Sequence, residues 1–246
     1  MLIRVQSYLL GKAQDIDAIE ELIVPAEDIE LANWKKNVMV LAEFKKELPE
    51  ELRKKIVKAY RSSGQDDVGV CNIDFNDFST DRHAVVIGNI SECITRDEMR
   101  AMYAHEVSHV ILGHTTDKSA TVLGILNETA KAMLPITVKL HMMELLFSSE
   151  IDLRVHQFAL LLIAINMLFA DYSQRREFDA DKRSISLSQN APALISFLRK
   201  AESPNLSGSI SEYLGSFFST HPNTDARAKS LGISEEAIAL PGVSFL

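Results

Sequence analysis

The feature that most constrains the fold is a pair of histidines, His105 and His109, in the segment AHEVSHVILGH at residues 104–114. Residues four apart share one face of an α-helix. A helix through this segment therefore presents both imidazoles to one point, at the separation that a single zinc ion requires. Glu106 lies about 100° further round the same helix. This spacing predicts a carboxylate beside the metal, placed to act as a base on metal-activated water.

The residues around the histidines are typical of a well-defined helix. Thr95 and Glu98 form a capping-box pattern, TRDE, in which each side chain accepts a hydrogen bond from the other residue's backbone N–H. Apolar residues that include Val107 and Val110 follow on the helix and predict that it packs in a core. Gly113 is suited to the position just after a helix ends. We therefore expect the helix to run from Thr95 to about Gly113.

A catalytic zinc site also requires a third protein ligand and leaves a fourth position open for water. His114 does not stand at the spacing of a metzincin third ligand, and we expect it to lie near the helix C-terminal dipole. Stronger candidates occur in RREFDADKRS, where Glu177 and Asp181 are four apart. We expect Glu177 to bind the metal and Asp181 to accept the outer N–H of a ligand histidine.

Three motifs in this order, HEVSH, EFDAD and STHPNTDAR, resemble those of the HtpX-like family of zinc metallopeptidases. That family also includes the CAAX prenyl endoprotease and several bacterial periplasmic proteases, and the resemblance covers roughly residues 68–232. It implies a gluzincin fold with one zinc ion per chain, bound by His105, His109 and Glu177. It also implies that Glu106 is the general base and that Asp181 supports a ligand histidine.

The resemblance implies roles for two residues near the C-terminus. His221 would lie at the mouth of the site. There it either donates a hydrogen bond to the tetrahedral oxyanion or takes the fourth zinc position and silences the enzyme at rest. Arg227 would pair with an acid near the site, Asp181 or Asp179, and the alternative is that it is a surface helix residue.

The strand that precedes the histidine helix has a further implied role. In the family, the corresponding strand lies at the edge of the sheet, where it can pair with the backbone of an extended substrate. The residues here are Ala84, Val85, Val86, Ile87 and Gly88. The alternative is that they simply form the last strand of the sheet.

The pattern of apolar residues predicts an α+β fold that is predominantly helical. Two short segments, 68–73 and 83–90, have the composition of strands. The first 65 residues, including 13–23 and 49–64, and most of the chain after residue 95 are expected to be helical. Pro135 is expected to kink or break the helix over 119–148.

With the resemblance, these segments predict three parts of the chain. They are a helical N-terminal region at 1–65, a metallopeptidase domain at 66–232 with a helical insertion at about 115–170, and a C-terminal tail at 233–246. The insertion carries charged residues throughout, so we expect its helices to cover the site or to mediate assembly of a homo-oligomer.

Composition excludes some partners. The net charge of −8 argues against nucleic acid, which needs clustered lysine and arginine. Cys71 and Cys93 are too few for a disulfide scaffold, and we expect both to be reduced and buried. The apolar segment 155–170 is shorter than the roughly 20 residues of a membrane span. It therefore predicts a buried core helix. Because the N-terminal segment also lacks the pattern of a signal peptide, we expect a cytoplasmic protein, with membrane association through 119–170 as the alternative.

The leading hypothesis is a zinc-dependent endopeptidase that acts on protein or peptide substrates. The N-terminal region, the insertion or His221 would block the cleft at rest. The alternative is a proteolytically silent, chaperone-like or regulatory binding protein that keeps the fold. The presence of Glu106 and of all three candidate ligands favours the enzyme.

Overall fold

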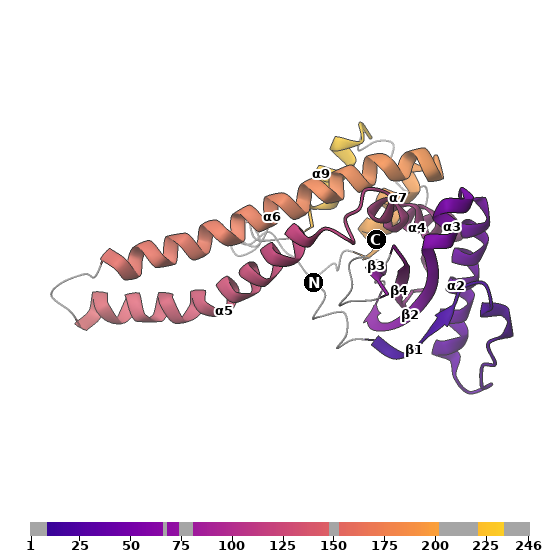
Figure 1. Ribbon diagram of the computed structural model, residues 1–246, viewed down its shortest axis with the longest axis horizontal. Coiled ribbons are helices and arrows are strands. Elements are labelled where there is room, and N and C mark those ends of the chain that lie inside the picture. Colours follow the sequence, from indigo (N-terminus) through magenta and orange to yellow (C-terminus); the bar gives the residue numbers. More distant parts are fainter. Residues whose placement is uncertain (1–8, 66–67, 74–80, 148–152, 202–220, 234–246) are drawn as a thin grey trace, which may run out of the picture. The chain divides into compact units, whose positions relative to one another are not determined.

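Four strands form one mixed sheet in the order β1-β2-β4-β3 (Figure 1). The computed structural model describes residues 9–65, 68–73, 81–147, 153–201 and 221–233. The strands are β1 (Leu9–Asp15), β2 (Ile56–Gln65), β3 (Val68–Asn72) and β4 (His83–Asn89). β2 runs parallel to β4, whereas β1 pairs with β2, and β3 with β4, in antiparallel fashion. With the helices below, this confirms a predominantly helical α+β fold.

The prediction that residues 1–65 are wholly helical was wrong. Residues 9–15 are strand, and the segment predicted as a helix over 49–64 is helical only at α3 (Glu50–Lys55) before β2 begins. The charged run EELRKK favours helix, but the following IVKAY is rich in β-branched and aromatic residues that suit a pleated surface. Because β1 and β2 belong to the same sheet as β3 and β4, the sheet continues across the expected boundary at residue 65.

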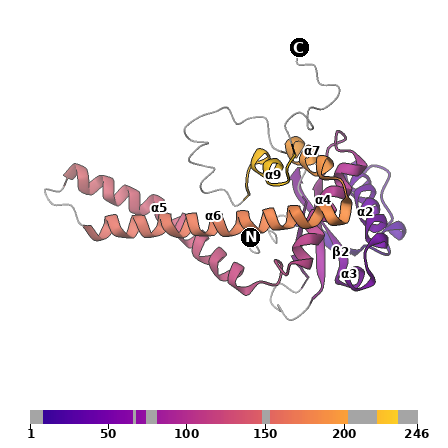
Figure 2. The same ribbon diagram turned by 90° about the horizontal axis from the view of Figure 1, so that it is seen from above.

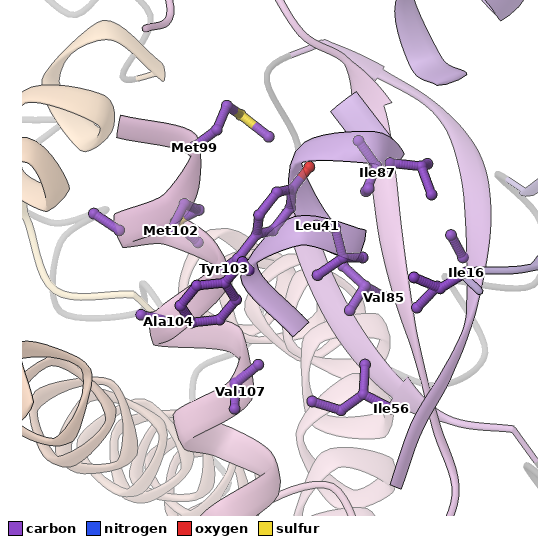
Figure 3. Close-up of a cluster of buried hydrophobic side chains, with 14 of the residues drawn as sticks. Ile16, Leu41, Ile56, Val85, Ile87, Met99, Met102, Tyr103, Ala104 and Val107 are labelled. Atoms are coloured by element: carbon purple, nitrogen blue, oxygen red, sulfur yellow. The ribbon is translucent and has the colours of Figure 1, made fainter. Parts of the chain in front are cut away.

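Helices α2 (Ile29–Glu47) and α4 (Arg96–Ile111) pack on one face of the sheet. Figure 3 shows Tyr103 of α4 next to Leu41 of α2, with Val85 and Ile87 of β4 on the sheet side. The tyrosine is fully buried, and its hydroxyl donates to the carbonyl of Asn37 at 2.9 Å. This core holds the histidine helix against the sheet.

The alternate residues of β4 point to the opposite face, as strand geometry requires. There Ala84 and Val86 form a smaller cluster with Cys71. Burial raises the pKa of the Cys71 thiol to about 12, so this cysteine is an inert packing residue. Both cysteines are free thiols, but Cys93 is exposed, which corrects the prediction that both are buried.

Two further helices cover the other side of α4 in this part of the chain. They are α7 (Ala191–Ala201), which packs on α4, and α9 (Thr224–Ser230), which packs on α7 (Figure 2). Asn223 caps α9 by accepting from the N–H of Ala226.

A second compact unit comprises residues 118–177 and 206–222, whereas the remaining residues form the first unit. Its described part is a hairpin of two long helices, α5 (Lys118–Phe147) and α6 (Leu153–Ser188) (Figure 1). Pro135 lies inside α5 without ending it. Residues 178–188 of α6 belong to the first unit.

Most of the apolar surface of α6 is exposed. Its length and composition would allow it to cross a membrane, and 22% of its most apolar window is buried. The prediction that residues 155–170 form a buried core helix was therefore wrong. Composition alone predicts a core helix here, because a sequence does not show whether other elements of the fold cover the apolar residues of this segment.

Candidate active site

Helix α4 carries the histidine pair, and its N-terminus has the predicted capping box. The backbone N–H of Glu98 donates to Thr95 Oγ1 at 3.3 Å, and that of Thr95 donates to Glu98 Oε2 at 2.7 Å. The helix ends at Ile111, and Gly113 follows with a φ of +69°, a conformation that glycine adopts at little cost. The predicted helix and both of its ends are confirmed.

The two histidines direct the same ring atom toward each other. His105 Nε2 lies 3.1 Å from His109 Nε2, and the rings meet edge to face with centroids 4.8 Å apart. Together with Glu177 they form the one group of three potential metal-binding side chains among the described residues. Their ligand atoms lie within 4.8 Å of one another. Two imidazole nitrogens and a carboxylate oxygen suit zinc and leave a coordination position open.

Asp181 holds the outer nitrogen of His105, and Arg227 holds Asp181 in turn. Asp181 Oδ1 lies 2.9 Å from His105 Nδ1. Arg227 donates to both carboxylate oxygens of Asp181, at 2.7 and 2.5 Å, and its Nη2 lies 3.3 Å from His105 Nδ1. The contacts expected for Asp181 and Arg227 are thus present, and all three side chains are buried.

This arrangement keeps Asp181 ionised. Burial acts to raise the pKa of its carboxyl, but hydrogen bonds from Arg227 and then His105 outweigh burial and lower the pKa below its ordinary value. An ionised Asp181 accepts the Nδ1–H of His105, which fixes the tautomer whose Nε2 is unprotonated and suited to binding a metal.

His114 lies against the outer nitrogen of His109, with the two Nδ1 atoms 2.9 Å apart. The helix end brings it there. The N–H of His114 donates to the carbonyl of His109, and the N–H of Gly113 donates to that of Val110. These are the two bonds of a Schellman motif, which packs the third residue after the helix onto a residue of its last turn. Sequence reasoning rejected His114 as a ligand and did not see this contact, although Gly113 was the signal for it.

Glu106 is buried, and its carboxylate lies beside the histidine pair. Its Oε1 atom is 4.0 Å from His105 Nε2, and 6% of the residue is exposed. The carboxylate therefore lies next to the candidate metal position and outside the group of ligand atoms.

His221 lies just before the cap of α9, with 59% of its side chain exposed. Its Nδ1 atom is 3.5 Å from Oε1 of Glu177, whose side chain is only 12% exposed. The structure thus brings His221 to the carboxylate that completes the candidate ligand group.

The model of peptidase family M48 matches residues 49–234, which is most of the chain and includes all of these side chains. The chain belongs to peptidase family M48. No curated protein matches it. Membership of M48 identifies the chain as a metallopeptidase by family, in agreement with the resemblance carried by the three motifs.

One expectation for this M48 member was wrong, namely that residues 84–88 lie at the sheet edge. Ala84, Val85, Val86 and Ile87 pair with β2 on one side and with β3 on the other. A strand with neighbours on both sides has no row of unpaired backbone N–H and C=O groups with which a substrate could pair. The family resemblance supplied the order of the motifs but could not show that residues 68–72 add a further strand outside β4.

Proposed function

We propose that this M48 member is a zinc-dependent endopeptidase. The observation that carries the proposal is the convergence of His105 Nε2 and His109 Nε2, 3.1 Å apart, in a group with the carboxylate of Glu177. A zinc ion held by these three residues would act as a Lewis acid that activates water and polarises the scissile carbonyl.

The residues of the chain then have separate tasks. Glu106 accepts a proton from the attacking water and returns it to the leaving nitrogen, because its carboxylate lies beside the ligand group. Asp181 orients His105 through its outer nitrogen, and Arg227 holds Asp181 in place. The burial of Glu106 excludes bulk water from the proton that it carries.

We assign substrate alignment to β3 in place of β4. Among the described strands, β3 is the edge strand next to β4, and its outer side has no partner there. An extended peptide can add to such an edge through backbone hydrogen bonds, which suits an enzyme that cleaves within a chain.

For His221 we favour the role of hydrogen-bond donor over that of resting zinc ligand. The group of three potential ligands among the described residues does not include it, and its exposed ring contacts Glu177. A His221→Ala variant separates the two roles. Slower cleavage with unchanged zinc content supports the donor, whereas faster cleavage supports a latch.

The deciding experiment compares wild type with Glu106→Gln, which keeps the size of the side chain and removes the base. We expect about one zinc ion per chain in both proteins, and cleavage of unfolded casein by wild type alone, with a loss of at least ~100-fold in the variant. Zinc in both with cleavage by neither would favour the silent binding protein. No zinc in either would refute the metal site.

A further inference from the structure

Helix α5 presents an apolar stripe whose spacing alternates between three and four residues. Its members all project from one side of the helix and are all exposed: Val122, Leu126, Thr129, Met133, Ile136, Leu140 and Met143. This is the spacing of a helix that packs along another helix in a coiled coil. We call these seven residues the α5 stripe.

The α5 stripe lies beside the face through which α5 packs on α6 and borders it near Met133. That inner face is made of small or polar buried residues, including Gly124, Asn127, Ala130 and Thr137. Gly124 lies against the ring of Phe169 on α6. Small and polar residues of α5 therefore make the closest packing against α6, and the larger apolar side chains of the stripe remain exposed.

An apolar hollow of about 330 Å³ interrupts the α5 stripe near its centre. It is lined by Met133, Ile136 and Leu140 from the stripe and by Val155 and Phe158 from α6. In knobs-into-holes packing, a hollow of this kind receives a side chain that projects from the facing helix.

We propose that a second copy of this chain covers the α5 stripe, with the two α5 helices antiparallel about a two-fold axis beside Met133. A two-fold interface uses the same surface on both subunits, and the stripe supplies both projecting side chains and the hollow that receives them. The stripe runs for about 30 Å along α5, and a standard stable interface buries roughly 800 Å² per partner.

Charge on the flank of the stripe favours the antiparallel pairing. Glu128 and Lys139 lie about three helical turns apart on the same side of α5. If the two-fold axis passes beside Met133, Glu128 of one copy stands opposite a position one residue from Lys139 of the other copy. The two charged residues are then offset by only ~1.5 Å along the helix axis. The symmetry makes this ion pair twice. Glu128 also contacts Lys131 at 3.2 Å, but an exposed pair of this kind contributes under about 1 kcal/mol.

The same charges disfavour a lipid bilayer as the occupant of the stripe. Among the described helices, α6 alone has the length and composition to cross a membrane. Helix α5 carries Glu128, Lys131 and Lys139 along its middle, and charged residues at that depth in a bilayer cost about 2.5–3.5 kcal/mol each.

The test is the molar mass of the zinc-loaded full chain, measured by light scattering and sedimentation across micromolar concentrations. We expect a dimer for wild type. Met133→Glu should weaken dimerisation at least tenfold without changing helix content or bound zinc. Val138→Glu is the matched control, because Val138 is an exposed apolar residue of α5 outside the stripe, and this variant should remain dimeric.

A charge exchange tests the orientation of the two copies. Glu128→Lys and Lys139→Glu should each weaken the dimer, and the double variant should restore it. A wild type that stays monomeric overturns the proposal, as does a Val138→Glu variant that dissociates as readily as Met133→Glu. Monomers that bind neutral lipid vesicles through Met133 would show that lipid covers the stripe.

Discussion

At the scale of single residues, the two metal-facing histidines are held by different partners. The outer nitrogen of His105 lies next to an ionised carboxylate and an arginine. The outer nitrogen of His109 lies next to a second imidazole, that of His114. A metal-bound imidazole carries its proton on the outer nitrogen, so His114 must accept from His109 through Nδ1. We therefore expect the two candidate ligands to respond to different substitutions.

Replacing His114 should weaken zinc binding without unfolding the protein. We expect His114→Ala to lower zinc affinity about 10–100-fold, measured by competition with a chromogenic chelator. His114→Asn should recover much of the loss, because the side-chain amide oxygen can accept from His109 Nδ1. Equal affinity in wild type and His114→Ala would mean that the 2.9 Å contact does not orient His109.

At the scale of elements, Glu98 completes the capping box of α4 and also links α4 to α7 through hydrogen bonds. Its carboxylate accepts from Ser196 Oγ at 2.5 Å and from Lys200 Nζ at 2.9 Å, in addition to the N–H of Thr95. Burial acts to raise the pKa of Glu98, but hydrogen bonds from Lys200, Ser196 and Thr95 outweigh it, and the pKa is lowered.

A lowered pKa fixes the direction of the pH effect. The stability that Glu98 provides is present above the unfolded-state pKa of about 4.3 and is lost as pH falls through the lower folded-state value. We expect Glu98→Gln to destabilise the protein by about 1–3 kcal/mol at neutral pH, and by less in acid. Urea titrations at several pH values measure the free energy of unfolding of both proteins. A difference between wild type and Glu98→Gln that does not shrink in acid would contradict this prediction.

How well an element could be predicted depended on where its stabilising contacts lie. Helix α4 was predicted to its ends because Thr95, Glu98 and Gly113 act on neighbouring residues. Strand β2 was missed because the sequence before it, EELRKK, is helical and its pairing partners lie in β1 and β4. The motifs brought Glu177 and Asp181 to the site, but they could not show that β3 displaces β4 from the edge.

At the scale of the whole molecule, the candidate metal site joins segments that are distant in sequence. His105 and His109 lie on α4 and Glu177 on α6, so a zinc site formed by them exists only in the folded chain. A ligand that binds only the folded state stabilises it by about 2.7 kcal/mol at a concentration 100 times its Kd.

Removal of zinc should therefore lower the melting temperature. With free zinc at about 100 times Kd, we expect chelation to lower Tm by roughly 5–10 °C, and readdition of zinc to restore it. His109→Ala should melt at the same temperature with and without chelator. If the Tm of wild type were the same with and without chelator, metal binding would not be coupled to folding.

Helix α6 carries both acidic residues of the candidate site that lie outside α4. It runs without interruption from the hairpin through Glu177 to Asp181, and the boundary between the two units falls directly after Glu177. Insertion of a single residue between Glu177 and Asp181 would turn one carboxylate about 100° round the helix from the other. The four-residue spacing therefore cannot vary without separating the candidate ligand from the residue that supports His105.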